Sequence, residues 1–230
     1  VRQQMTTTVI SYPERNPRDR VWGANNYPGN CSGKVALGFI DKLQADSMFE
    51  LCAGSGTNYD MCLDYGVPYC GVDLNPNPVR DGIKSMDFTD MSQEFPDEIR
   101  TADMVFSHMP YPGINRIKYS NGAWKGSPEL AKRDIQNMPF AQGMQEINKA
   151  HMRAYHAMKP GAFMVMLVGE IRANGKFYSM NQALCLPGEF YQSYVKLQHN
   201  TWSGRQNRSY GNSQRALTGH EMIAVIRKPG

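Results

Sequence analysis

Short apolar segments that end in turns of Gly, Asp or Pro alternate with helix-like segments from about residue 30 to the end of the chain. The most constraining of them is AFMVMLVGEI at 162–171, a nearly continuous apolar run. Such a run is typical of a strand that is buried on both faces of a parallel sheet. The alternation predicts an α/β fold built from βαβ units, with a mostly parallel sheet.

The other elements follow from periodicity and turn signals. Further strands are expected at 47–51, 67–76, 82–88, 101–108, 194–200 and 220–228, and helices at 30–43, 58–66 and 140–158. The last two strands follow each other without a helix, so we expect an antiparallel hairpin at one edge of a seven-stranded sheet. The length of 230 residues fits one domain. Residues 1–30 are expected to form an irregular arm, and 112–139 and 201–219 long polar loops.

The composition argues against several classes of protein. Hydrophobic residues make up 41% of the chain, yet no apolar run reaches the roughly 18 residues that a membrane helix needs. The first 20 residues lack the apolar core of a secretory signal. The five cysteines are scattered, without a Cys-x-x-Cys pair. We therefore expect a cytoplasmic protein with neither a disulfide framework nor a metal site.

The net charge of +4 is unevenly distributed. Residues 45–104 contain twelve acidic and three basic residues, whereas residues 201–230 contain five basic residues and one acidic residue. Basic ends beside an acidic middle suit a polyanion that approaches one face. A solvated surface with uneven charge is the alternative, and the charge pattern alone does not separate the two.

A glycine-rich turn follows the strand at 47–51. In FELCAGSGTN, Gly54 and Gly56 permit tight backbone turns and a close approach by a ligand. Ser55 and Thr57 can cap the next helix or contact a polar ligand. No Lys follows the second Gly, and the three-glycine fingerprint is absent, so neither a P-loop nor a dinucleotide site is indicated. A purely structural turn is the alternative.

Acidic residues follow the next two strands. Asp73 lies 17 residues beyond Gly56, where a carboxylate can accept hydrogen bonds from both ribose hydroxyls. Asp87 and Phe88 follow the third strand and can hold an adenine by its amino group and its ring face. The alternatives are a turn Asp at 73 and a surface Asp beside a core Phe at 87 and 88. Together these residues describe a nucleoside pocket without a cluster of Lys and Arg, which suits S-adenosylmethionine better than NAD or ATP.

Two further segments carry a family resemblance. VFSHMPYPG at 105–113 follows the fourth strand, and the KPGAF turn at 159–163 opens the fifth. With the glycine turn, they resemble the amino-methyltransferases that modify nucleic acids, which carry an Asp/Asn/Ser-Pro-Pro-Tyr/Phe motif after the fourth strand. The resemblance covers most of residues 30–230 and implies a Rossmann-like methyltransferase fold with S-adenosylmethionine as cofactor.

The cofactor residues that the resemblance implies are Asn30, Ser32, Glu50, Cys52, Ala53, Gly54, Ser55, Gly56, Thr57, Asp73, Leu74, Asp87 and Phe88. For Asn30 and Ser32, simple helix capping is an equal alternative.

The resemblance implies that His108, Met109, Pro110 and Tyr111 form the catalytic motif. In the family, the first side chain and the carbonyl of the second residue accept hydrogen bonds from the target amine, and the aromatic ring stacks on a flipped-out base. Met109 replaces a proline, but Pro110 still holds it extended. Ser107 is the fallback acceptor if the register is shifted by one.

Histidine at the first position makes the motif sensitive to protonation. A neutral imidazole has one acceptor nitrogen, whereas an imidazolium has only donors. We therefore expect activity to fall as the pH drops through the pKa of His108, for which the reference value is about 6.5. A strand-end histidine in a chain that has lost catalysis is the alternative.

The two polar loops supply the expected contacts to nucleic acid, because they mix charged and aromatic side chains. The residues are Arg116, Lys118, Trp124 and Lys125 in the first loop and Trp202, Arg205, Arg208 and Arg215 in the last. We expect methylation of an exocyclic amine in DNA, adenine N6 first and cytosine N4 next, with RNA as the alternative substrate. A nucleic-acid-binding or cofactor-binding protein without transfer is the alternative class. Because the family's recognition domain is missing, we expect a short target, a homodimer or a specificity partner.

Overall fold

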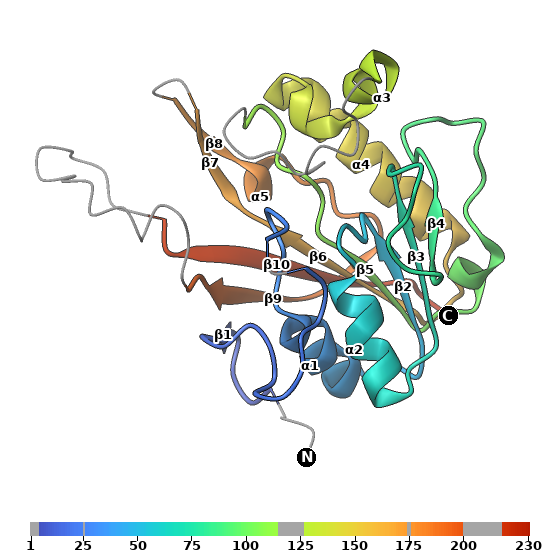
Figure 1. Ribbon diagram of the computed structural model, residues 1–230, viewed down its shortest axis with the longest axis vertical. Helices are drawn as coiled ribbons and strands as arrows, with labels where there is room; N and C mark the ends of the chain where they lie inside the picture. The colour runs from blue at the N-terminus through green and yellow to red at the C-terminus, as the bar shows by residue number, and fades with distance from the viewer. Residues whose placement is uncertain (1–4, 25, 115–126, 174–175, 200–217) are drawn as a thin grey trace, which may run out of the picture.

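The computed structural model describes residues 5–24, 26–114, 127–173, 176–199 and 218–230. An eight-stranded sheet runs through them, with helices on both faces (Figure 1). The strand order is β1-β9-β10-β6-β5-β2-β3-β4. The bounds are β1 Val9–Ile10, β2 Met48–Leu51, β3 Tyr69–Asp73, β4 Ile83–Ser85, β5 Met104–Ser107, β6 Phe163–Val168, β9 Glu189–Leu197 and β10 His220–Arg227.

The pairing confirms the expected α/β fold with a mostly parallel sheet and antiparallel C-terminal strands. The strands β4, β3, β2, β5 and β6 are parallel neighbours, and β10 is antiparallel to both β6 and β9. Two details differ from the prediction. The short strand β1 adds an eighth member beside β9, so the hairpin of β9 and β10 has one further strand outside it, and β10 is the hairpin strand that joins β6. Residues 223–226 of β10 are buried without interruption, which fits an internal strand.

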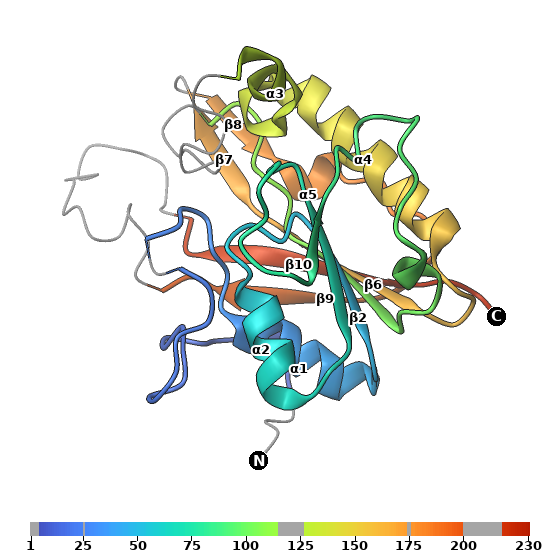
Figure 2. The ribbon, with the colours of Figure 1, turned by 45° about the vertical axis from the view of Figure 1, so that its right-hand side comes forward.

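Helices cover both faces of the sheet (Figures 1 and 2). The helices α1 (Gly33–Leu43) and α2 (Thr57–Tyr65) lie on one face, and α4 (Phe140–Ala157) lies on the other. Since successive side chains of a strand point to opposite faces, Met164 of β6 packs in the core on the α4 side and Val165 in the core on the α1 side. The apolar run at 162–171 is therefore buried on both faces, as predicted.

Several short elements were not predicted. They are η1 (Asp97–Arg100), α3 (Pro128–Arg133), η2 (Ile135–Asn137), the hairpin β7 (Glu170–Ala173) and β8 (Lys176–Ser179), and α5 (Met180–Ala183). The helix α3 buries no residue, so it leaves no apolar period in the sequence. The strand expected at 162–171 ends at 168, and β7 begins at Glu170. Between them the chain passes close to Tyr111 at Gly169, where a Cβ would lie 2.5 Å from the Tyr111 hydroxyl.

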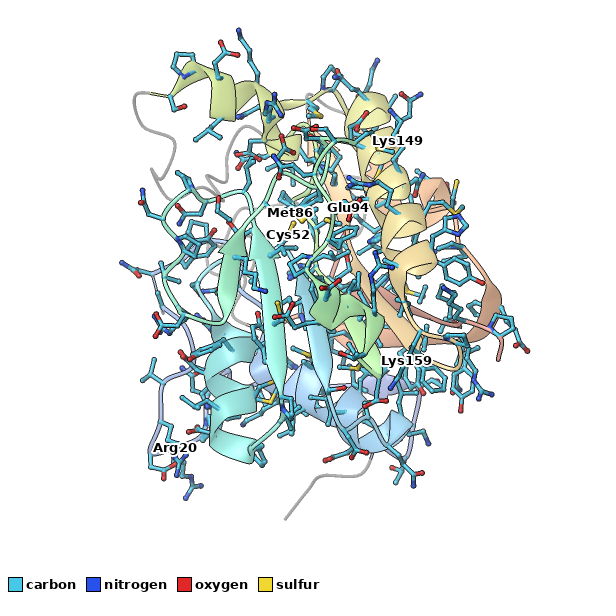
Figure 3. All side chains as sticks on the ribbon, turned by 90° about the vertical axis from the view of Figure 1, so that its right-hand side faces the viewer. Arg20, Cys52, Met86, Glu94, Lys149 and Lys159 are labelled. Carbon is cyan, nitrogen blue, oxygen red and sulfur yellow. The ribbon has the colours of Figure 1, made fainter. Side chains whose placement is uncertain are left out.

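The carboxyl ends of the parallel strands meet at one end of the sheet. Cys52 and Met86, which directly follow β2 and β4, lie at the same end in Figure 3, whereas Lys159 lies toward the other end. Ligands of such sheets bind outside the carboxyl ends. None of the helices in the described part of the chain has the length and apolar character needed to cross a membrane.

Candidate active site

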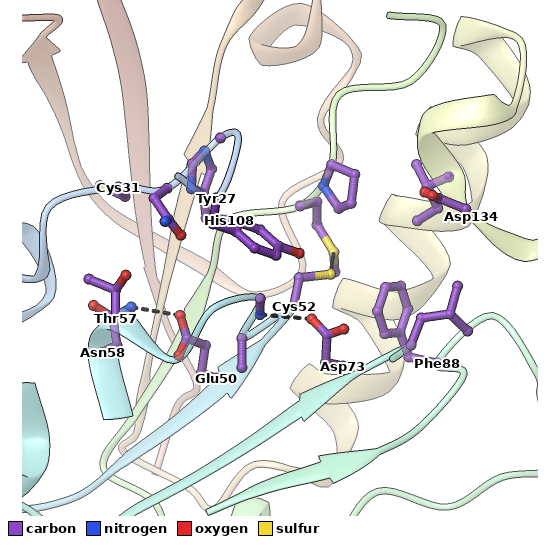
Figure 4. A pocket seen from close by; sticks show the side chains of 18 of the residues that line it. Tyr27, Cys31, Glu50, Cys52, Thr57, Asn58, Asp73, Phe88, His108 and Asp134 are labelled. Atoms are coloured by element: carbon purple, nitrogen blue, oxygen red, sulfur yellow. Dashed lines mark hydrogen bonds between the residues drawn. The ribbon is translucent and has the colours of Figure 1, made fainter. Parts of the chain in front are cut away.

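A pocket opens at the carboxyl ends of β2, β3 and β5 (Figure 4). Its wall consists of the glycine turn after β2, the turns after β3 and β4, and the segment after β5. Residues 27–31 of the N-terminal segment and residues 133–135 complete it. The sheet topology thus brings together turns that lie far apart in the sequence.

The glycine turn and the expected ribose acid form one unit. Cys52, Ala53, Gly54 and Thr57 line the pocket, and the backbone is left-handed at Cys52 (φ 61°) and Gly54 (φ 54°). The Gly54 N–H donates to Oδ2 of Asp73 at 2.8 Å, and Oδ1 accepts from a second backbone N–H at 2.9 Å. Burial raises the pKa of Asp73, although both hydrogen bonds favour its charged form. The carboxylate is held rigidly at the pocket wall.

Glu50 is a buried carboxyl in the same wall. Its Oε1 accepts a hydrogen bond from Nδ2 of Asn58 at 2.6 Å, and its Oε2 accepts from the Tyr69 hydroxyl at 2.5 Å. Burial raises the pKa of Glu50 to about 8. A cation bound against this carboxyl would restore its charged form, so Glu50 suits a ligand with an ammonium group.

The expected adenine end also lines the pocket. Leu74, Asp87 and Phe88 belong to its wall, and the Phe88 ring points into it in Figure 4. Nη1 of Arg133 donates to Oδ2 of Asp87 at 2.6 Å, so α3 already holds this carboxylate. Among the described residues of the wall, Arg133 is the sole Lys or Arg. The pocket therefore lacks a basic cluster for phosphate in the part that the structure describes.

The N-terminal segment contributes Tyr27, which the sequence did not reveal, and Asn30, which was expected and lines the pocket. A Cβ at Gly54 would lie 3.2 Å from the Tyr27 ring, which covers the glycine turn. Asn30 donates to the Ala24 carbonyl and accepts from the Ser55 hydroxyl, both at 2.7 Å. Asn30 thus fastens the segment to the turn, and Tyr27 carries no periodic signal that could have predicted its place.

Three of the expected cofactor residues do not line the pocket. Ser32 caps α1 and donates to the Arg15 carbonyl at 2.8 Å, which is the capping alternative stated above. Ser55 is buried behind the turn. Gly56 begins α2 with φ 76°, and its Cβ position faces Arg80. These residues shape the turn from behind.

The segment after β5 presents three of the four expected catalytic residues. His108, Met109 and Pro110 line the pocket, and the Met109 sulfur accepts from the Cys52 thiol at 3.3 Å. Burial lowers the pKa of His108 to about 4. The imidazole is therefore neutral at physiological pH, and the loss of activity that we expected near pH 6.5 moves to about pH 4.

Tyr111 differs from its expected role. Its ring is 9% exposed and is not part of the pocket wall, and its hydroxyl donates to Oε1 of Glu221 at 2.5 Å. A base stacked in the pocket does not meet this ring in the described arrangement. The physical reason is the buried carboxylate, which holds the phenol behind the motif.

The fallback acceptor Ser107 also lies away from the pocket. Its side chain is 1% exposed and forms a 2.7 Å hydrogen bond with Nε2 of the buried His151 on α4. The register with His108 at the first position is therefore the one that presents a polar side chain to the pocket.

An ion pair that the sequence did not predict lies close to the motif. The ion pair of Lys196 and Glu221 lies behind His108, and no spacing rule relates residues on two different strands to a motif on a third.

All eight expected nucleic-acid contacts, Arg116, Lys118, Trp124, Lys125, Trp202, Arg205, Arg208 and Arg215, lie outside the described residues. Within the described residues, no group of three or more His, Cys, Asp or Glu is arranged to hold a metal ion.

No family model and no curated protein matches the sequence. Solved structures with similar folds include TrmN from Thermus thermophilus, with 14% identity, a TM-score of 0.48 and coverage of 86% of this chain and 49% of TrmN. The N-methyltransferase NodS from Bradyrhizobium japonicum, in complex with S-adenosylhomocysteine, has 9% identity, a TM-score of 0.45 and coverage of 81% and 79%. A SAM-dependent methyltransferase from Methanosarcina mazei has 10% identity, a TM-score of 0.42 and coverage of 80% and 92%. The chain thus spans about half the length of TrmN.

Proposed function

We propose that this chain is a methyltransferase domain that uses S-adenosylmethionine to methylate an exocyclic amine of a nucleobase, with adenine N6 in DNA as the first substrate to test. The observation that carries the proposal is one pocket wall that contains Asp73, Phe88 and His108 together. Asp73 can bind the ribose of the methyl donor and Phe88 can contact its adenine ring. His108 lies beside them as a neutral acceptor for the target amine. Cytosine N4 and RNA bases are the next substrates.

The donor set of the pocket fits the cofactor. The Asp73 carboxylate is an acceptor for ribose hydroxyls, and the raised pKa of Glu50 suits a positively charged ammonium group. The glycine turn leaves room for a close approach, because Gly54 is left-handed and lacks a Cβ. When bound, S-adenosylmethionine supplies an electrophilic methyl group. The residues around it have to orient it and exclude water.

The motif residues act on the amine. The lone pair of an exocyclic amine is delocalised into the base, so the amine is a weak nucleophile. Neutral His108 accepts a hydrogen bond from one N–H, and the backbone carbonyl of Met109 accepts from the other. These bonds localise the lone pair on nitrogen and direct it toward the methyl group. In the transfer, the N–C bond would form as the C–S bond breaks, S-adenosylhomocysteine would be the leaving group, and the proton lost by the amine would pass to the acceptor nitrogen of His108.

Binding and transfer are tested in sequence. Each hydrogen bond from a ribose hydroxyl to the charged Asp73 is worth about 1.5 to 3 kcal/mol, so we expect Asp73→Ala to lower the affinity for labelled S-adenosylmethionine by at least roughly tenfold. Asp97→Ala is the matched control, since the Asp97 side chain is 98% exposed and outside the pocket. Unchanged affinity in Asp73→Ala, with an unchanged melting temperature, would contradict the pocket assignment.

Transfer itself is measured with a tritiated methyl donor. DNA and RNA are offered separately, and the methylated nucleosides are identified after digestion. Label on N6-methyladenine from DNA is the expected result, and its absence in His108→Leu is the control. If the donor binds but no nucleic acid is labelled, the methyl-transfer proposal fails for these substrates. The buried place of Tyr111 favours the second candidate in that case, a binding protein without transfer.

A further inference from the structure

A buried ion pair lies directly behind the proposed catalytic motif. Lys196 of β9 and Glu221 of β10 face each other in the antiparallel register, and Nζ of Lys196 donates to Oε2 of Glu221. Their side chains are 13% and 8% exposed. Two opposite charges removed from water carry a desolvation penalty that a pair of apolar residues would not. A role other than stability is therefore worth seeking for this pair.

The carboxylate of Glu221 contacts the motif through its second oxygen. Oε1 accepts the 2.5 Å hydrogen bond from the Tyr111 hydroxyl and lies 4.0 Å from Nε2 of His108. The two rings meet edge to face, with centroids 5.9 Å apart. Oε1 of Glu221 therefore lies near the rings of both His108 and Tyr111. It places a negative charge on the Nε2 side of the His108 ring.

A lone carboxylate at this position would harm the chemistry proposed above. An opposite charge within about 4 to 6 Å favours the charged form of an imidazole, and an imidazolium has no acceptor for the target amine. The ammonium of Lys196 cancels the charge of Glu221. The pair can then orient the ring without protonating it.

We propose that Lys196 and Glu221 are positioning residues: Glu221 orients His108 and Tyr111, and Lys196 neutralises Glu221 so that the imidazole keeps a lone pair for the amine. This inference rests on the proposed function, because it gives the ion pair a role in methyl transfer. Its test measures the pKa of His108 and needs no transferase activity. Because Nε2 of His108 lies 4.0 Å from Oε1 of Glu221, we expect the neutral ring to carry its proton on Nε2, which would leave Nδ1 as the acceptor nitrogen.

The charges around His108 agree with this arrangement. Burial lowers the pKa of His108, Glu221 acts to raise it, and Lys196 acts to lower it. The other titratable groups that face this cluster are the Tyr111 phenol and the Cys31 thiol from the N-terminal segment. Burial raises the pKa of Cys31 to about 11, so the thiol adds no charge at neutral pH.

The test is a histidine NMR titration of the full chain. The signals of His108 are assigned by their loss in His108→Asn. In Lys196→Met, we expect the pKa of His108 to rise by about 1 to 3, while Lys196→Arg keeps it near the wild-type value. In the double variant Lys196→Met with Glu221→Gln, it returns to the wild-type value or below. Lys149→Met, which breaks an exposed pair with Glu146, is the control without effect.

The outcomes separate this inference from the proposed function. An unchanged pKa of His108 in Lys196→Met, or an equal rise in the double variant, overturns the role of the pair. If Lys196→Met does not fold, Glu221→Gln alone decides: a rise in the pKa of His108 overturns the inference, and a fall supports it. No methyl donor is needed, so a protein without transferase activity still gives an answer. In an active protein, the acid limb of the rate profile should move by the same amount as the pKa.

Discussion

Replacing Glu50 with Gln tests the electrostatics of the pocket without any ligand. The pKa of Glu50 rises from 4.5 to about 8 on folding because the carboxyl is buried. Between these values the folded protein binds more protons than the unfolded chain, so the free energy of unfolding falls as the pH rises through this window. At pH 7 the window has been crossed by about 2.5 pH units, and at about 1.36 kcal/mol per unit the loss is about 3 kcal/mol.

The amide should retain the local contacts. In Glu50→Gln, its oxygen can accept from Asn58 and its nitrogen can donate to the Tyr69 hydroxyl, so the shape and both hydrogen bonds are preserved. We expect a gain of about 2 to 3 kcal/mol at pH 7 and less than about 1 kcal/mol at pH 5, measured by denaturant unfolding. Glu98→Gln, at an exposed pair with Lys84, is the control and should change stability by less than about 1 kcal/mol.

The change in stability of Glu50→Gln across pH 5, 7 and 9 decides the outcome. A gain in Glu50→Gln that is equal at pH 5, 7 and 9 would show that the carboxyl keeps an ordinary pKa in the folded protein. A loss of stability at pH 9 would show that its charged form is stabilised by the surrounding dipoles. Either result refutes the reasoning, because both contradict a carboxyl whose proton is retained by burial.

Four further substitutions test the surrounding structure. Gly66→Ala should cost only the strain of a left-handed backbone, about 1 to 2 kcal/mol, because nothing lies within 4 Å of its Cβ position. Gly54→Ala should cost more, because its Cβ would also lie 3.2 Å from the Tyr27 ring. Equal unfolding midpoints of the two variants would contradict that contact. Arg153→Met removes donors to three carbonyls of the 88–93 loop and should cost about 2 to 4 kcal/mol in urea unfolding, and a loss below about 1 kcal/mol would be inconsistent with this. Burial lowers the pKa of His151 to about 4, so the free energy of unfolding falls as the pH drops from 6.5 toward 4. His151→Gln should remove about 3 kcal/mol of that loss. If the melting temperature of His151→Gln falls with decreasing pH as steeply as that of the wild type, the prediction is wrong.

The parts of the fold that follow from the sequence are those with a strong local signal. The apolar run of β6 and the glycine turn before α2 required only side-chain pattern and backbone conformation. The order of β9 and β10 required more, because a hairpin at the end of a chain can pair with the sheet through either strand. Burial decides the order: β10 is covered on both faces, while most of β9 is partly or fully exposed. The sequence contains this information as an apolar run at 222–226. The alternation of strand and helix segments, from which the fold was predicted, does not indicate which of the two strands is buried.

The residues of the candidate site divide in the same way. Asp73 is the last residue of β3, and Phe88 and His108 follow β4 and β5, so their common place at the carboxyl edge could be predicted from topology. Tyr27 could not be predicted, because it reaches the pocket from a segment without regular structure. The place of Tyr111 outside the pocket wall could not be predicted for a related reason: the resemblance implies an aromatic ring at this position, but the partner of its hydroxyl, Glu221, lies 110 residues away on another strand.

The histidine in the motif and the ion pair behind it are best understood together. A carboxylate or amide at position 108 would be an acceptor at any physiological pH, whereas an imidazole is an acceptor only while it is neutral. Burial alone would keep it neutral, but a buried ring without an oriented neighbour has two tautomers to choose from. In the proposed arrangement, Glu221 favours the tautomer with its proton on Nε2, and the charge of Lys196 offsets the tendency of the carboxylate to stabilise the imidazolium. The strand order makes this possible, because β10 is antiparallel to β9 and places residues that lie 25 positions apart opposite each other. A change in the motif is thus compensated by two side chains that no motif contains.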